Sequence, residues 1–562
     1  MVILGLSCYF HDSAASLWVD GKLVAAAQEE RFNRQKNTPV FPIQAINSCF
    51  QAAGLSPSEI DRVGFYEKPY FKFYRVVFDH LRSWPMSYPS FRRSLPKWFQ
   101  ERLSLPLTLK EELGYEKDTY FIPHHLAHAA SAFFLSPFEE AAVCTADSVG
   151  EWASLSCGVA QRNSIQLQKE MRYPESLGLV YSAVTTYLGF KAHSGEGKVM
   201  GLASYGKPSL TKKFEEMVKV LPDGSFKIDA SFFPFNSGKR MFGQKLVDTF
   251  GPPRSPESEI TDRHQDIAAS LQEFFENTLV KITRKLYEDT QLENLCLAGG
   301  VFLNCSANQK ILEHSGFRNL FIQPAAGDAG GALGVAAYIN HAVLKNPRTQ
   351  PQDSSSLGPT FSASEMERAL RSQGLSFKKF EPDEFLNIVA DALTRDCAVG
   401  WFQDRMEFGP RALGNRSILA SPLRAKMRDY LNHKVKKREG FRPFGPVVCL
   451  EDSHRYFDLS IPSPFMLLAP KVRKEMQTVI PAVTHADQTA RIQTLTESQN
   501  PKLYRLLKLF GDKTGTPVLI NTSFNLRGEP IVCSPEDAVS CFKKCELDAL
   551  AIGDYWVEKS TK

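Results

Sequence analysis

The sequence predicts an α/β protein with two domains, the first of them built from a duplicated unit. At 562 residues the chain is longer than one ordinary hydrophobic core encloses. A strand, an acidic turn and a second strand occur at the start and again at residues 141–160. A Pro-, Ser- and Gly-rich stretch, residues 346–364, predicts a linker. We therefore predict domains at residues 1–345 and 365–562.

The first copy of the repeated unit opens the chain. Three strands are expected between residues 2 and 28, with a tight Asp-Gly turn before the third. The loop between the first two strands carries His11 and Asp12, and its small residues leave backbone amides free to face a phosphate. Taken alone, the commoner interpretation is a turn in which Asp12 caps the local backbone.

Three of the twelve histidines lie close together at the expected start of a helix, after Pro123. His124 and His128 are i and i+4 neighbours on one helix face, with Cβ atoms roughly 5–6 Å apart. Two such imidazoles can hold one transition-metal ion. The alternative is a polar helix start with three satisfied histidines. His125 faces away from the pair, so we expect it to be structural.

Two carboxylates are candidates to complete a metal-ligand set with His124 and His128. Asp147 follows an expected apolar strand, where its side chain meets the edge of a sheet. Asp328 lies among four glycines in residues 327–334, and we expect it on exposed, tightly turned backbone. Such a set of nitrogen and oxygen donors suits Fe(II), Mn(II) or Zn(II), and the sequence alone does not choose among them.

A glycine pair, Gly299 and Gly300, separates an expected buried strand from a helix that begins near Asn304. Glycines at this position allow a phosphate to approach the backbone at the N-terminus of the helix. Packing of a helix on a sheet also favours glycine, so both interpretations stay open.

Residues 66–115 form an insertion in which aromatic side chains alternate with Lys and Arg. Such a mixture could line a pocket for a polar ring compound or stack on bases. An amphipathic insertion packed on the core explains it equally well.

The C-terminal domain concentrates arginine and lysine. Residues 424–442 hold eight Lys or Arg and two acids, and Arg411 lies in a Gly-Pro-Arg-Ala-Leu-Gly motif. Because Arg grips phosphate or carboxylate through two hydrogen bonds, the domain is expected to bind a compact polyanion. A solvated basic face is the alternative. It fits Lys434, Lys436, Lys437 and Arg438 better than Arg411, whose neighbours imply a packed environment.

The composition of the chain excludes some classes of protein and indicates where it resides. A net charge of +5 is small for this length and argues against a protein that coats nucleic acid. Eleven scattered cysteines without a C-x-x-C pair favour a reducing compartment. The opening residues lack a basic segment and predict a strand, so we expect no signal peptide, and the sequence contains no run of eighteen apolar residues. We therefore expect a cytoplasmic protein without a membrane partner.

In their order along the whole chain, these motifs resemble the O-carbamoyltransferases of nodulation-factor and antibiotic biosynthesis. The segments that carry the resemblance are residues 5–14, 124–132, 196–206, 299–304, 327–334, 407–419, 436–445 and 517–525. The resemblance implies an N-terminal domain of actin-like ATPase fold, a duplicated ribonuclease-H-like unit. It also implies a C-terminal α/β domain similar to enzymes that make threonylcarbamoyl-adenylate.

The resemblance implies a two-site reaction. The C-terminal domain would convert carbamoyl phosphate and ATP, with Mg²⁺, to carbamoyl-adenylate. The N-terminal metal site would pass the carbamoyl group to a hydroxyl of a small-molecule natural product. Fe(II) is the favoured metal, with Mn(II) and Zn(II) as alternatives. The acceptor, which could be an aminosugar, polyketide, alkaloid-like toxin or lipo-oligosaccharide, and the oligomeric state stay open, with a homo-oligomer compatible with the sequence.

The family's functional residues carry over by motif. His11 matches the residue implicated in transfer, and His124, His128, Asp147 and Asp328 match the metal ligands. Arg411 and Arg442 match contacts to carbamoyl phosphate. Contacts to nucleotide or carbamoyl-adenylate are expected from Lys36, Gly299, Gly300, Asn304, Lys436, Arg491, Asn521 and Ser523.

Two other functions compete with this interpretation. The first is a tRNA modifier that makes threonylcarbamoyl-adenosine, with residues 424–442 as an RNA-binding patch. The modest overall charge and the aromatic insertion argue against it. The second is a non-catalytic ATP-binding protein of actin-like fold, which would leave the metal-ligand set and the C-terminal domain unexplained.

Overall fold

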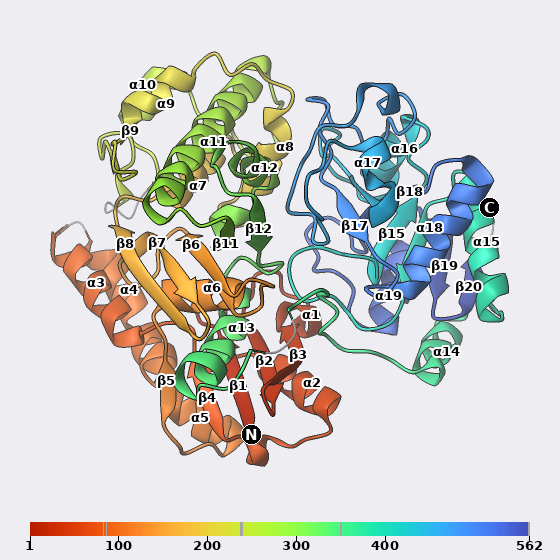
Figure 1. Ribbon diagram of the computed structural model, residues 1–562, viewed down its shortest axis with the longest axis horizontal. Coiled ribbons are helices and arrows are strands. Elements are labelled where there is room, and N and C mark those ends of the chain that lie inside the picture. The colour runs from red at the N-terminus through yellow and green to blue at the C-terminus, as the bar shows by residue number, and fades with distance from the viewer. Residues whose placement is uncertain (83, 86, 236–239, 349–350, 560–562) are drawn as a thin grey trace. The chain divides into compact units, whose positions relative to one another are not determined.

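The computed structural model describes residues 1–82, 84–85, 87–235, 240–348 and 351–559 (Figure 1). The chain forms two compact units: unit 1 comprises residues 1–25 and 39–352, and unit 2 comprises residues 26–38 and 353–562. The predicted domain 1–345 therefore differs from unit 1 at residues 26–38 and 346–352. Positions 83 and 86 of the predicted insertion, and 349–350 of the predicted linker, lie outside the described residues.

Two five-stranded sheets form the centre of unit 1 and repeat one strand order, β3-β2-β1-β4-β5 and β8-β7-β6-β11-β12. The middle strands, β1 and β6, each have an antiparallel neighbour on one side, β2 or β7, and a parallel neighbour on the other, β4 or β11. The mixed α/β fold and its duplication, predicted from the sequence, are confirmed. The strands are β1 Val2–Ser7, β2 Ala14–Val19, β3 Lys22–Gln28, β4 Arg62–Phe65, β5 Thr119–Phe121, β6 Glu140–Ala146, β7 Ala153–Gln161, β8 Ser164–Arg172, β11 Asn294–Ala298 and β12 Asn319–Ile322.

Two helices join these sheets. Helix α13 (Ala329–Tyr338) packs on β1, β2 and β4, α6 (His124–Phe133) packs on β6 and β11, and the two helices pack on each other. Their backbones approach so closely that a Cβ on Gly334 would lie 1.8 Å from the carbonyl oxygen of Ala127. Only glycine fits at this crossing. The close packing brings the N-terminal end of α13 beside α6.

Further helices cover the second sheet, the longest being α11 (Asp262–Thr290), which contacts β6 and β7. Residues such as Ile267, Leu271 and Phe274 recur at helical spacing on its buried face. Around it lie α7 Leu177–Tyr187, α8 Glu196–Ala203, α9 Thr211–Met217, α10 Gln244–Phe250, α12 Cys305–His314 and a small hairpin, β9 Val218–Val220 with β10 Phe226–Ile228.

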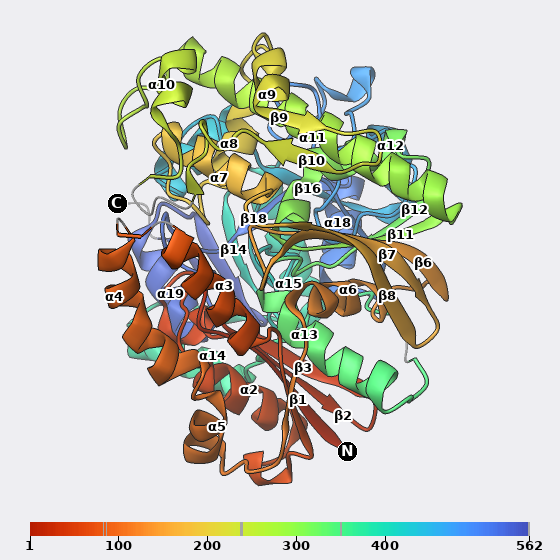
Figure 2. The same cartoon turned by 90° about the vertical axis from the view of Figure 1, so that its left-hand side faces the viewer.

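The predicted insertion is helical, with α3 and α4 packed against each other (Figure 2). The helices that accompany the first sheet are α2 Ile43–Ala53, α3 Pro69–Arg82, α4 Tyr88–Lys97 and α5 Leu105–Leu113, with a π-helical turn at Trp98–Arg102. Among the described residues, no helix combines the length and the apolar character that a membrane span requires.

Unit 2 is built on one mixed eight-stranded sheet of order β13-β20-β19-β14-β15-β18-β16-β17. Helices α15 and α18 pack against each other and against the sheet, in a core that includes Phe385, Trp401 and Leu507. The strands are β13 Lys378–Lys379, β14 Val399–Phe402, β15 Arg416–Ala420, β16 Gly445–Cys449, β17 Gln493–Leu495, β18 Val518–Ser523, β19 Ala549–Ile552 and β20 Tyr555–Glu558. The helices are α1 Glu30–Asn33, α14 Ala363–Ser372, α15 Pro382–Thr394, α16 Lys426–Asp429, α17 Ser453–Tyr456, α18 Pro501–Thr514 and α19 Pro535–Lys544.

Candidate active site

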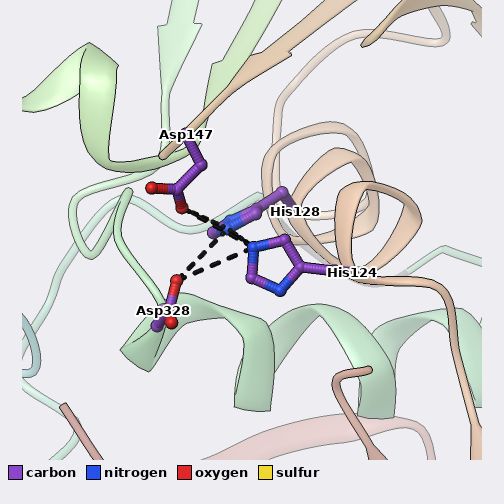
Figure 3. Close-up of side chains that lie close together, drawn as sticks. All are labelled: His124, His128, Asp147 and Asp328. Carbon is purple, nitrogen blue, oxygen red and sulfur yellow. Dashed lines mark hydrogen bonds and ion pairs between the residues drawn. The ribbon is translucent and has the colours of Figure 1, made fainter. Parts of the chain in front are cut away.

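Four side chains that the sequence singles out as metal ligands converge in unit 1: His124, His128, Asp147 and Asp328 (Figure 3). Their donor atoms all lie within 4.8 Å of one another, and all four residues are buried. The Nε2 atoms of His124 and His128 are 3.2 Å apart, and His128 Nε2 is 3.2 Å from Asp147 Oδ2. Asp328 Oδ1 lies 3.8 Å from His124 Nε2 and 3.7 Å from His128 Nε2.

Local structure explains the positions of His124 and His128. They project from the first two turns of α6, whose N-terminus is capped by Glu151: its carboxylate accepts a hydrogen bond from the backbone N–H of His124, at 3.0 Å, and from that of Lys68, at 2.7 Å. Asp147 directly follows β6, and its Oδ1 accepts from the N–H of Ser148 at 2.7 Å. A helix start and a strand end thus meet at this site.

Asp328 is placed differently from our expectation. It is 2% exposed, which contradicts the expected exposure, and it lies at the end of a turn, residues 324–328, that leads into the N-terminus of α13. The glycines that follow it serve close packing, because a Cβ on Gly331 would lie 2.8 Å from the ring of Tyr66. The glycine-rich pattern therefore reflects helix packing, and this packing carries the carboxylate to the histidines.

The donor set fits a divalent transition metal. Two imidazole nitrogens and two carboxylates are the ligand types that Fe(II), Mn(II) and Zn(II) accept. Burial lowers the pKa of His128, but hydrogen bonds and charge from Asp147 and Asp328 outweigh it and raise the pKa to about 9. Burial would likewise raise the pKa of Asp147, whereas His124 and His128 hold it well below its usual range. The cluster thus attracts positive charge at the point where its donor atoms converge.

His125, the middle histidine of the run, takes no part in this cluster. One ring nitrogen, Nδ1, lies 2.8 Å from Thr145 Oγ1 and the other, Nε2, lies 3.0 Å from the carbonyl oxygen of Ala153. Burial, followed by the charge of the neighbouring histidines, lowers the pKa of His125 to about 3. The ring ties α6 to β6 and β7, in agreement with its expected structural role.

His11 borders the cluster from the loop between β1 and β2. Its Nε2 lies 3.7 Å from Asp328 Oδ2, and its Nδ1 lies 3.0 Å from Asp12 Oδ2. Burial lowers the pKa of His11, but Asp328 and Asp12 outweigh it and raise the pKa to about 9. An Nδ1–H that donates to Asp12 leaves Nε2 directed toward the cluster.

The loop that carries His11 is held by residues of the insertion that the sequence did not single out. Arg102 donates through Nε to the carbonyl oxygen of Tyr9 at 3.2 Å. Phe10 lies under two cations, with Lys72 Nζ 4.8 Å and the Arg102 guanidinium 5.9 Å from its ring centroid. Lys72 in turn forms a buried ion pair with Glu67. No short motif signals this arrangement, because its parts are distant in sequence.

The glycine pair lies beside the metal-ligand cluster. Gly299 has φ +103°, and a Cβ there would lie 2.0 Å from the carbonyl oxygen of Ala146. A Cβ on Gly300 would lie 3.3 Å from Asp147 Oδ1. Asn304 caps α12 by accepting from the N–H of Ala307 at 3.0 Å. Close approach of these backbones is therefore required for packing, and the predicted nucleotide contacts of Gly299, Gly300 and Asn304 stay predictions.

A second cluster of predicted residues meets in unit 2. Lys436 Nζ donates to Ser523 Oγ at 3.2 Å, to the carbonyl oxygen of Asn525 at 3.0 Å and to Asn525 Oδ1 at 2.7 Å. Asn521 lies on β18 and donates to Gln493 Oε1 at 2.7 Å. Lys436 is 2% exposed, which contradicts the solvated-face interpretation for this residue. The exposed Lys434 fits that interpretation.

Several positively charged side chains lie close together around Lys436 in unit 2. Burial, followed by the charges of Arg442 and Arg491, lowers the pKa of Arg438 well below its usual range. Burial also lowers the pKa of Lys436, and Arg438 adds to the shift. The acid Glu439 lies 3.9 Å from Arg442 and 3.6 Å from Arg527. Repulsion within this group is relieved by an anion, so the cluster is a candidate anion site, and Arg438 is a member that the sequence assigned to the surface.

Two further predicted residues lie elsewhere in unit 2. Arg411 is partly buried in the connection between β14 and β15. Lys36 is exposed, in the segment 26–38. That segment is anchored by Arg34, which donates to the carbonyl oxygens of Ile531 at 2.7 Å and Pro530 at 3.0 Å.

Fold and sites define a class of α/β protein with a duplicated unit, a buried nitrogen–oxygen donor cluster and a separate anion site. The profile described as "Carbamoyltransferase N-terminus" matches residues 2–337, and that described as "Carbamoyltransferase C-terminus" matches residues 390–559. The chain belongs to the carbamoyltransferase family and is an enzyme of that family.

Individual relatives extend along the whole chain. An uncharacterized protein of Synechocystis sp. is 44% identical and covers 100% of this chain and 97% of its own length. Nodulation protein NolNO of Sinorhizobium fredii is 36% identical over 98% of this chain and 80% of its own length. The 3'-hydroxymethylcephem-O-carbamoyltransferase of Amycolatopsis lactamdurans is 29% identical over 81% of this chain and 83% of its own.

Proposed function

We propose that this protein is an ATP-dependent O-carbamoyltransferase that acts in two steps. In unit 2, carbamoyl phosphate loses its phosphate to water, and an oxygen of the resulting carbamate attacks the α-phosphorus of ATP and displaces pyrophosphate. In unit 1, an acceptor hydroxyl attacks the carbamoyl carbon, and AMP leaves. Adenylation is needed because a carbamate is a poor electrophile without a good leaving group.

The observation that carries the proposal is the convergence of His124, His128, Asp147 and Asp328 beside His11. These four side chains would hold the metal, with Fe(II) favoured and Mn(II) or Zn(II) as alternatives. When bound, the cation would polarise the carbamoyl oxygen and offset the carboxylate charge that raises the pKa of His11. With its Nδ1 fixed by Asp12, His11 accepts the proton of the acceptor hydroxyl at Nε2.

The anion site of unit 2 supports the first step. Lys436, Arg442 and Arg491 supply positive charge for a phosphorylated substrate, in a setting where burial strengthens electrostatic attraction. In this proposal Arg411 and Arg442 bind carbamoyl phosphate. Nucleotide contacts come from Lys36, Gly299, Gly300, Asn304, Lys436, Arg491, Asn521 and Ser523. ATP is bound with Mg²⁺.

The acceptor is proposed by analogy with the relatives. The names of two of these relatives specify nodulation and the carbamoylation of a hydroxymethylcephem. A hydroxyl of a small natural product is therefore the acceptor class we propose here.

Pyrophosphate release tests the first step. Purified protein is given ATP, Mg²⁺ and carbamoyl phosphate without acceptor, beside Arg411→Ala and a control, Arg368→Ala, at an exposed position of α14. We expect release that depends on carbamoyl phosphate, survives in the control and falls at least about a hundredfold in Arg411→Ala. Release supported by bicarbonate and threonine instead would favour the tRNA modifier and contradict the proposal.

A further inference from the structure

Helix α3 of the insertion is amphipathic, but its aromatic side faces outward and its buried side carries cations. Its outward side is formed by Tyr70, Phe71, Tyr74, Phe78 and Leu81, which we call the aromatic face; their exposed fractions run from 40% to 68%. Its buried side chains include two cations, Lys72 at 3% and Arg75 at 7% exposed. Buried cations and exposed aromatic rings are both unusual, and here they share one helix.

Specific contacts of the two buried cations hold α3 in this orientation. Lys72 is paired with Glu67. Arg75 lies 3.5 Å from Asp79, and its guanidinium lies 5.0 Å from the centroid of the Tyr173 ring. Rotating α3 to bury its aromatic face would take Lys72 away from Glu67 and Arg75 away from the Tyr173 ring, whereas the pair of Arg75 with Asp79 lies within α3. These contacts therefore keep the aromatic face of α3 directed outward.

The aromatic face is too large to be incidental. With roughly 200 Å² for each large side chain, the exposed fractions of its five members amount to about 600 Å². A monomeric protein rarely exposes a contiguous apolar patch of more than a few hundred Å², and larger ones mark interaction sites.

The charged side chains beside the aromatic face indicate the kind of partner that binds there. Beside α3, the exposed charged side chains of α4 are Arg92, Arg93 and Lys97, which we call the basic edge. Among the described residues between 66 and 100, no acidic side chain is exposed. A second copy of this chain would bring one basic edge toward another, so self-association here is opposed by repulsion. An anionic partner is favoured.

We propose that α3 and α4 (Figure 2) form a docking surface for a membrane with anionic lipids. Tyrosine and tryptophan favour the level of the lipid headgroups, and an interfacial helix buries its apolar side there while Lys and Arg meet anionic lipids. The sequence predicts no membrane partner because it lacks a spanning segment, but binding to a membrane surface does not require one. No member of the aromatic face or the basic edge is among the residues assigned to chemistry in the proposed function.

Vesicle flotation of the full-length protein tests this surface. Vesicles of phosphatidylcholine alone are compared with vesicles that contain about 30% phosphatidylglycerol, at low and high salt. We expect binding to the anionic vesicles that weakens as salt rises. Arg92→Glu with Arg93→Glu should lower the bound-to-free ratio at least about tenfold. The control, Lys281→Glu with Lys544→Glu, makes the same change in net charge at exposed positions elsewhere and should bind as the parent does.

Two further readouts separate membrane contact from other causes. Phe71→Ser with Tyr74→Ser should also lose binding while keeping the unfolding temperature, because both side chains are exposed. Trp84, whose ring centroid lies 5.3 Å from that of Tyr88, should shift its fluorescence to the blue on binding. Absence of binding by folded protein, equal loss in the charge control, or a dimer in light scattering that Tyr74→Ser dissociates would each overturn the proposal.

Discussion

Arg102 donates through its Nε to the carbonyl oxygen of Tyr9, at 3.2 Å, two residues before His11. Tyr9 and Asp12 have φ of 72° and 54°, in the left-handed region that non-glycine residues rarely occupy. Backbone in that region persists only when its surroundings hold it. The insertion thus supports the loop that presents His11.

Arg102→Ala should loosen this loop. We expect kcat/KM for carbamoyl transfer to fall about ten- to a hundredfold, because a small misplacement of His11 removes its alignment. Hydrogen exchange of residues 8–13 should become faster, a readout that does not depend on activity. The control, Arg82→Ala, removes an exposed arginine of α3 and should change neither quantity. Normal exchange in Arg102→Ala would contradict the supporting role.

Metal content separates His128 from His125. Because His128 contributes a donor to the cluster and His125 does not, His128→Ala should lose most of the bound transition metal measured by mass spectrometry. His125→Ala should retain the metal but unfold more readily, since it leaves Thr145 Oγ1 and the carbonyl of Ala153 without their ring partners. Equal metal loss in both variants would argue against the assignment.

Removal of metal by a chelator should destabilise the protein. The carboxylates of Asp147 and Asp328 then lose a shared cation, and a ligand that binds only the folded state stabilises it. We expect the midpoint of thermal unfolding to drop by several degrees and to recover when Fe(II), Mn(II) or Zn(II) is restored. A midpoint that no divalent transition metal changes would count against the site.

Lys436→Met should destabilise unit 2. The buried Lys436 Nζ donates to partly buried oxygens of Ser523 and Asn525, so the substitution removes these hydrogen bonds, at a cost of about 1–3 kcal/mol in the free energy of unfolding. Lys434→Met, two residues away at an exposed position, should cost less than about 0.5 kcal/mol. Denaturant titration of both variants compares them directly. Similar midpoints for the two would show that Lys436 is not a structural anchor.

His485 predicts a window of acid sensitivity. Burial lowers its pKa to about 4, whereas an unfolded histidine titrates near 6.5. Between these values the unfolded chain binds the extra proton, so the free energy of unfolding rises with pH there, by at most about 1.4 kcal/mol per pH unit for this residue. His485→Gln should flatten the dependence in this window. An unchanged slope from pH 4 to 6.5 would contradict the assignment.

Local sequence pattern was enough to pair His124 with His128, since residues four apart on a helix share a face whatever the helix packs against. Strand ends and glycine-rich segments also marked Asp147 and Asp328 as candidates. The pattern misjudged the surroundings of Asp328, because glycines that permit tight turns also permit helices to cross closely.

The aromatic insertion shows a feature that local sequence pattern does not predict. Periodicity predicts that α3 has an apolar stripe, but it does not say which way the stripe faces. The tertiary contacts of Lys72 with the Phe10 ring and of Arg75 with the Tyr173 ring hold that stripe outward, and the arginine that holds the His11 loop comes from a distant turn of the chain.

The sequence by itself determined the duplicated α/β fold, the family and the residue types of the candidate site. Each rests on spacing or motif order along the chain. Tertiary structure alone decided that four donor atoms meet, that Arg438 joins the buried Lys436 in one cluster of cations and that an aromatic face remains exposed. Those outcomes depend on which distant segments pack together, and local propensity does not encode that choice.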